Sequence, residues 1–95
     1  MHPWTLFLSQ IFKEAFYKRA GDHFGHARDI VMLLADGLRH DPYSMAIYRS
    51  QSTPPPPLWI YVSPPVGPHP AIRIAYLIEH EERIVTLYSF DQESS

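Results

Sequence analysis

The 95-residue chain contains no cysteine, only four glycines, and no apolar run near the roughly 20 residues that cross a bilayer. Without cysteine the chain cannot form disulfides, thiolate nucleophiles or cysteine zinc sites. No glycine array of the kind that cradles phosphates is present. The apolar residues 4–8 are not preceded by a basic region, which predicts that there is no signal peptide. We therefore expect a cytoplasmic protein without a membrane segment or a cofactor.

The chain also lacks a basic excess. Its formal net charge is −2, with six basic and five acidic residues in the stretch 1–49 and two basic and five acidic residues in 50–95. Proteins that bind nucleic acid usually carry a strong positive charge, because neutralising phosphates supplies most of their affinity. A general nucleic-acid binder is disfavoured, although a local basic patch stays open. The length predicts a single domain over residues 1–95.

Two helices are expected in the first half of the chain. Residues 4–8 are rich in aromatic and aliphatic side chains and predict a short strand, after which Ser9 is placed to cap a helix over residues 10–19. A second helix follows over residues 24–40, with apolar side chains at helical spacing, and it stops at Asp41-Pro42 because a residue before proline avoids helical geometry. The longer helix should be the main cover of a sheet.

The second half of the chain predicts strands separated by proline. Apolar or alternating runs lie at residues 45–51, 58–62, 71–78 and 83–90, with a charged turn at 79–82. The proline-rich stretches 54–57 and 64–70 interrupt pairing because proline has no N–H to donate. Whether they are stiff loops or docking segments is left open. Segregated helices and strands predict an α+β fold, with two N-terminal helices on one face of a mainly antiparallel sheet of four or five strands.

Arg73 is the first candidate functional residue. Alternation in the strand at 71–78 places Ile72, Ile74 and Tyr76 on one face, the better candidate for the covered face, and Arg73 on the other. On an open face the planar guanidinium can hold a phosphate or a carboxylate. The alternative is an arginine whose stem simply lies across the sheet surface.

The order of elements resembles the RelE/ParE toxin superfamily. The resemblance rests on WTLFLSQIFKEAF, on a helix ending LRHDPYS, on LWIYV and on RIAYLIEHEERIVTLYSF, with Arg73 and Tyr76 in its strand. It implies a domain held by a small antitoxin. One branch of the superfamily cleaves messenger RNA at the ribosome and another inhibits DNA gyrase. By this resemblance Arg73 would lie beside the scissile phosphate, Arg49 would be a second cation and Tyr88 a proton donor.

The end of the chain departs from the nuclease pattern. Asp91 and Glu93 follow Tyr88 where the resemblance implies cations, which favours a reduced or lost nuclease activity. One alternative is therefore a non-catalytic interaction domain of the same fold. Another is a small metal- or ligand-binding protein that uses His23 and His26, although two imidazoles do not make a site and spacing fixes no third ligand. The oligomeric state and the cellular target are left open.

Overall fold

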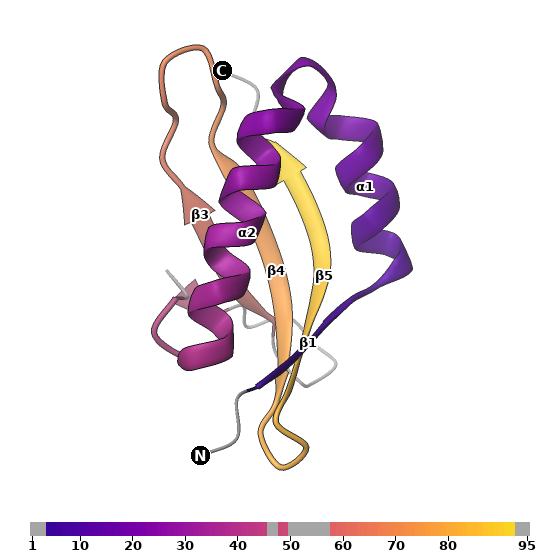
Figure 1. Cartoon of the computed structure of the whole chain (residues 1–95), viewed down its shortest axis with the longest axis vertical. Helices are drawn as coiled ribbons and strands as arrows, with labels where there is room; N and C mark the ends of the chain where they lie inside the picture. The colour runs from indigo at the N-terminus through magenta and orange to yellow at the C-terminus, as the bar shows by residue number, and fades with distance from the viewer. Residues whose placement is uncertain (1–3, 46–47, 50–57, 93–95) are drawn as a thin grey trace.

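The computed structural model describes residues 4–45, 48–49 and 58–92. The elements follow one another as β1 (Thr5–Leu8), α1 (Gln10–Ala20), a short 3-10 helix η1 (Gly21–His23), α2 (Phe24–His40), β2 (Tyr48–Arg49), β3 (Trp59–Ser63), β4 (Ile72–Glu79) and β5 (Ile84–Gln92) (Figure 1). The expected α+β fold is confirmed, with both helices preceding most of the sheet.

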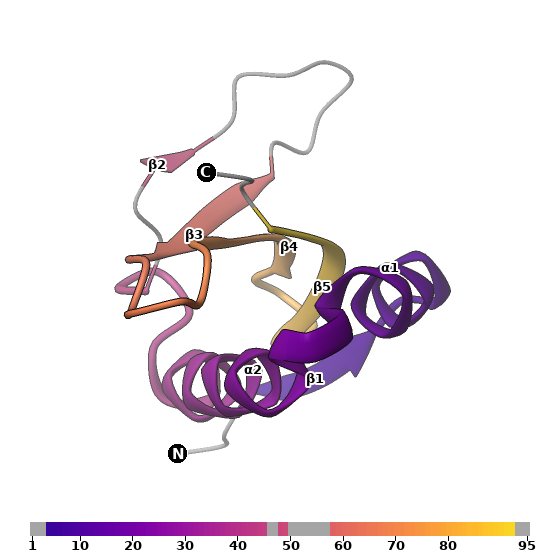
Figure 2. The same ribbon diagram turned by 90° about the horizontal axis from the view of Figure 1, so that it is seen from above.

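The five strands form one sheet in the order β1-β5-β4-β3-β2. β1 runs parallel to β5, and every other neighbouring pair is antiparallel. Both helices lie on the same side of the sheet (Figure 2). The first strand joins the last one at one edge of the sheet, which leaves β5, β4 and β3 in its interior.

The helices start and end where local chemistry sets their limits. The Ser9 hydroxyl accepts a hydrogen bond from the Phe12 amide at 3.0 Å, as an N-cap does, and donates to the Tyr88 carbonyl at 3.1 Å. Gly21 ends α1 with φ at 51°, a conformation that glycine adopts without strain. α2 continues to His40 and buries Ala27, Leu34 and Leu38 along one stripe.

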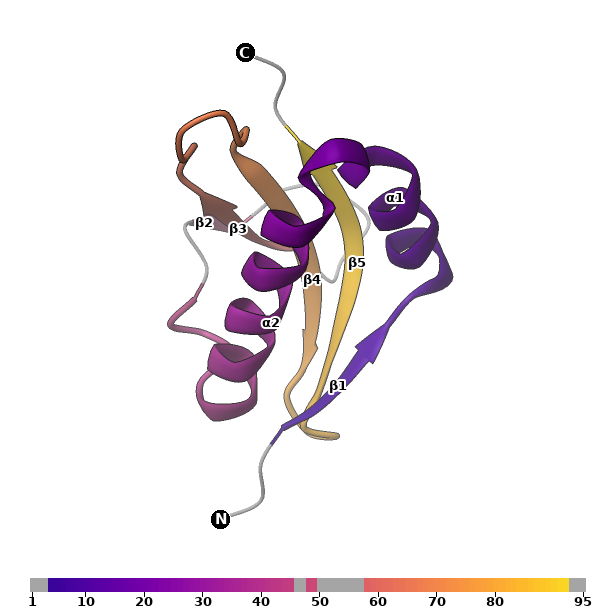
Figure 3. The same cartoon turned by 45° about the horizontal axis from the view of Figure 1, so that its top comes forward.

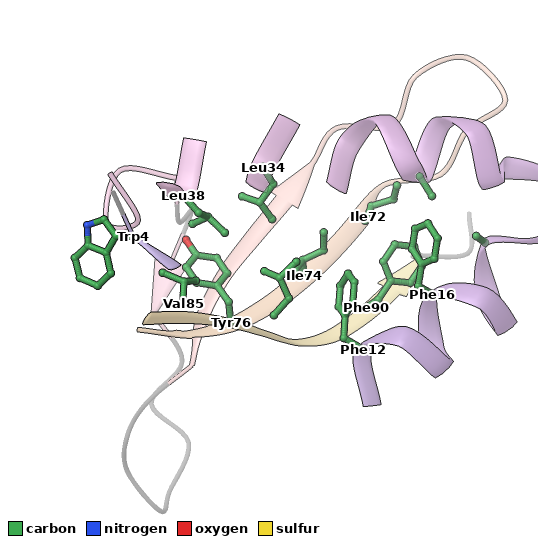
Figure 4. Close-up of a cluster of buried hydrophobic side chains, with 13 residues drawn as sticks. Trp4, Phe12, Phe16, Leu34, Leu38, Ile72, Ile74, Tyr76, Val85 and Phe90 are labelled. Carbon is green, nitrogen blue, oxygen red and sulfur yellow. The ribbon is translucent and has the colours of Figure 1, made fainter. Parts of the chain in front are cut away.

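The core lies between the helices and the inner face of β4 and β5. Ile72, Ile74 and Tyr76 of β4 are fully buried against α2, which contributes Leu34 and Leu38 (Figure 4). At the other end, the rings of Phe12 and Phe16 from α1 pack on Phe90 of β5, with ring centroids 6.0 and 5.2 Å from that ring. The aromatic rings join α1 to the end of β5.

A β-bulge in β5 sets which residues face the helices. Ala75 pairs with Ser89 but Tyr76 pairs with Leu87, so Tyr88 is an extra residue without a partner in this ladder. Leu87 and Phe90 are consequently both buried although they are three residues apart, a spacing that regular alternation forbids. The bulge lets β5 cover both the α2 and the α1 ends of the core.

Some details differ from the sequence-based expectations. Phe24, expected on the buried face of α2, begins the helix at the margin of the core and is 39% exposed, with its ring against Phe16 on one side and Tyr17 on the other. Of the strand expected at 45–51, Tyr48–Arg49 pairs with β3, while residues 46–47 and 50–51 lie outside the described part, as does the proline run 54–57. The loop 64–70 contains a turn closed between Val66 and His69. In the described part, no helix has the length and apolar character to cross a membrane.

The helix register generates a stability prediction. Leu34 is fully buried, whereas its neighbour Leu33 is 61% exposed. We expect Leu34→Ala to lower the free energy of unfolding by about 2–5 kcal/mol, because it leaves a cavity in the core. Leu33→Ala, the matched control, should change it by less than about 0.5 kcal/mol. Urea unfolding measures both, and equal effects of the two substitutions would contradict the orientation of α2.

Candidate functional site

Arg73 lies on the face of the sheet opposite the helices. In the ladder it stands between Val62 of β3 and Asp91 of β5, and its side chain is exposed. The flanking residues Ile72 and Ile74 point into the core. Burial of these neighbours fixes the backbone of the strand at Arg73. An exposed guanidinium on a fixed backbone is suited to contact an anion.

A carboxylate occupies the position opposite Arg73. Asp91 Oδ1 lies 3.0 Å from Nη1 of Arg19, at the end of α1, and accepts a hydrogen bond from the Gln92 amide at 2.9 Å. Both members of the ion pair are 56% exposed, so the pair contributes at most about 1 kcal/mol to stability. Its importance is electrostatic, because Asp91 reduces the positive potential beside Arg73.

Arg49 and Tyr88 lie in other rows of the sheet. Arg49 pairs with Trp59, which in turn pairs with Tyr76 of β4. Tyr76 follows Arg73 by three residues, so the backbone of Arg49 lies two strands away from Arg73 and about 10 Å further along the strand direction. Tyr88 is the bulged residue of β5 and is 39% exposed. The three residues predicted for catalysis therefore do not share one row, and the residue directly opposite Arg73 is acidic.

Tyr76, the second residue of the Arg-x-x-Tyr resemblance, is an anchor of the core. Its side chain is fully buried and its hydroxyl donates a hydrogen bond to the Pro42 carbonyl at 3.3 Å. Burial raises the pKa of the Tyr76 hydroxyl, which keeps it protonated and able to donate. This contact ties the centre of the sheet to the segment that follows α2.

A second candidate surface is an apolar groove between the two helices. It has a volume of about 210 Å³ and is lined by Leu8, Phe12, Lys13, Phe16, Tyr17, Arg28, Val31 and Met32. Most of the lining residues belong to α1 and α2, which lie on either side of β5 in the view of Figure 3. Sequence reasoning missed this groove, because periodicity shows which residues face the core but not how far apart two helices stand. Apolar residues outside the core stripes, such as Tyr17 and Met32, were the available signal.

The histidines are brought together in part. His23 and His26 lie near His69 of the loop 64–70, a third imidazole that sequence spacing could not identify. Among the described residues, no group of three or more histidine or acidic side chains is arranged to hold a metal ion.

Comparison with known proteins identifies the fold. No protein-family model and no curated protein matches the sequence. A solved structure that the chain resembles is the toxin–antitoxin complex RelBE2 from Mycobacterium tuberculosis, with a TM-score of 0.71 and 13% identity over 96% of this chain and 99% of that chain. The predicted RelE-like fold is therefore confirmed, whereas at this identity the likeness carries no activity.

The two faces of β4 generate a prediction about Arg73. We expect Arg73→Ala to change the free energy of unfolding by less than about 1 kcal/mol, because the side chain is exposed. Ile74→Ala, the control on the buried face, should cost about 2–5 kcal/mol. Urea denaturation would compare them. A loss above about 2 kcal/mol for Arg73→Ala would show that Arg73 is a structural residue.

Proposed function

We propose that the chain is a RelE-like toxin or toxin-derived domain that binds an antitoxin-type protein partner. The observation that carries this proposal is the exposed apolar groove between α1 and α2. It is supported by the fold, which the chain shares with a structure described as a toxin–antitoxin complex. We further propose that residues 1–95 act as one domain and that the protein works in the cytoplasm.

The size of the groove favours a protein partner over a small molecule. Pockets for drug-sized ligands and cofactors usually hold about 300–1,000 Å³, and this groove holds about 210 Å³. Such a volume suits a few apolar side chains from the face of a helix. The exposed Tyr17, Met32 and Leu8 would lose contact with water when covered, and each fully buried side chain of this kind contributes about 1.5–3 kcal/mol.

The polar residues of the groove indicate the chemistry of the partner. Lys13 and Arg28 contribute the two charged side chains among the lining residues, and both are basic. Acidic residues beside the apolar anchors of a partner helix would complement them and speed its association. We therefore propose an amphipathic helix with acidic flanks as the bound segment.

Binding is tested with the product of any small reading frame that lies beside this gene, co-expressed and purified with the chain. We expect a stable complex that Met32→Glu weakens at least tenfold, because the glutamate places a charge in the apolar groove and repels the acidic flanks of the partner. Leu33→Glu is the matched control, since Leu33 is equally exposed but does not line the groove. Calorimetric titration measures both. Equal affinities for the two variants would contradict binding at the groove.

A second candidate function is action on ribosome-bound messenger RNA or on gyrase. The exposed Arg73 favours an anion contact on the open face, and the opposing Asp91 favours the alternative of an interaction domain without catalysis. Messenger cleavage through Arg73 predicts that induction of the chain arrests growth and that Arg73→Ala and Arg73→Lys both relieve the arrest, because lysine lacks the bidentate fork. An arrest that persists in Arg73→Ala would contradict a nuclease that depends on this arginine.

A further inference from the structure

Three histidines from separate parts of the chain meet where the loop between β3 and β4 reaches the helix junction. His23 lies in η1, His26 in the first turn of α2 and His69 in the loop, and all three are half-buried. The Nδ1 atoms of His23 and His69 are 3.0 Å apart. The rings of His26 and His69 stack, with centroids 4.3 Å apart and an angle of 10° between planes.

The stacked geometry favours a role in proton binding over metal binding. An imidazole nitrogen binds a metal through a lone pair in the plane of its ring. Two parallel rings stacked face to face, such as those of His26 and His69, cannot direct in-plane lone pairs at one ion. The contacts in this cluster instead depend on how many protons the three rings carry.

The contact between His23 and His69 exists only while at least one of the two rings is neutral. One Nδ1 must donate its proton and the other must offer a lone pair, whichever tautomer each ring adopts. When both rings are protonated, two N–H groups point at each other. Protonation of His26 and His69 likewise brings two cations face to face in the stack. A charged His69 beside a charged His23 or a charged His26 is therefore incompatible with the packing of this cluster.

The charged side chains of the described residues around the cluster do not relieve this repulsion. The largest cause that lowers the pKa of His69 is desolvation, followed by the influence of His26 and then of His23. Asp22, next to His23, is exposed. The nearby ends of α1 and β5 contribute Arg19 and Asp91, which pair with each other.

Arg28 and Asp29 of α2 form a second exposed pair, with 3.9 Å between their closest charged atoms. Residues 64–70 of the loop contain no lysine, arginine, aspartate or glutamate, and His69 is the one side chain there that can become charged. In the part of the chain that the structure describes, the charged side chains of the neighbouring elements are thus exposed or already paired.

We infer that His23, His26 and His69 form a proton-sensitive latch that holds the β3–β4 loop against the helix junction when neutral and releases it when His69 and either of the other two rings are protonated. The loop is built to present His69 rigidly, because the amides and carbonyls of Val66 and His69 bond to each other at 3.0 and 2.9 Å. Gly67, with φ at 57°, permits this tight turn.

The sign of the pH effect follows from the direction of the shift. The pKa of His69 is lowered in the folded chain from the ordinary value of 6.5. Its contribution to stability is therefore complete above pH 6.5 and is lost as the pH falls from there through the lowered pKa.

The first test is an NMR titration of the histidine ring protons in the whole chain. We expect His69 to titrate below 6.5, and its midpoint to rise towards 6.5 in His26→Gln. His40→Gln is the control, because His40 lies at the exposed end of α2 beside Asp36 and should leave the midpoint unchanged. A midpoint for His69 at or above 6.5 in the unaltered chain overturns the latch, and this measurement needs no variant to fold.

The second test compares thermal unfolding at pH 7.5 and pH 5. We expect the fall in Tm between these values to be at least about 4 °C smaller in His69→Gln than in the unaltered chain, because the variant has no third imidazole to protonate. His40→Gln should fall as the unaltered chain does. Identical falls for His69→Gln and the unaltered chain would overturn the proposal.

Discussion

The alternation of side chains in β4 is the constraint on which the rest of the structure depends. Ile72, Ile74 and Tyr76 are fully buried beneath the helices, and Arg73 lies between them on the opposite face. A shift of one residue would place the guanidinium in the core, where an unpaired charge costs several kcal/mol, and would expose three large apolar side chains. The burial of one face of β4 therefore fixes the position of the functional candidate on the other.

Much of this arrangement could be predicted from sequence because its signals are local. The caps at Ser9 and Gly21 and the proline after Asp41 determine the helix ends, and alternation determines the faces of β4. The bulge at Tyr88 could not be predicted from sequence. It depends on how β5 pairs with β4 while β5 packs against both helices. The contact of His69 with His23 could not be predicted either, because residue spacing does not determine the course of the loop that carries His69.

The two candidate surfaces lie on opposite sides of the sheet. The groove is formed by the helices and β1, whereas Arg73 and Asp91 lie on the face without helices. A partner helix that fills the groove alone would leave Arg73 uncovered. Binding and any chemistry at Arg73 are therefore separable, and a partner that controls both must also pass around an edge of the sheet. The proposed binding at the groove therefore does not depend on the open face, where Asp91 stands opposite Arg73.

The central claim is that the groove between α1 and α2 receives an antitoxin-type partner. Chemical-shift mapping of the isotopically labelled chain, titrated with the product of a neighbouring small reading frame, tests it most directly. The account predicts that the largest shifts fall on Phe16, Val31, Met32 and the other groove residues. Shifts confined to the open face around Val62, Arg73 and Ser89, with the groove unchanged, would contradict it.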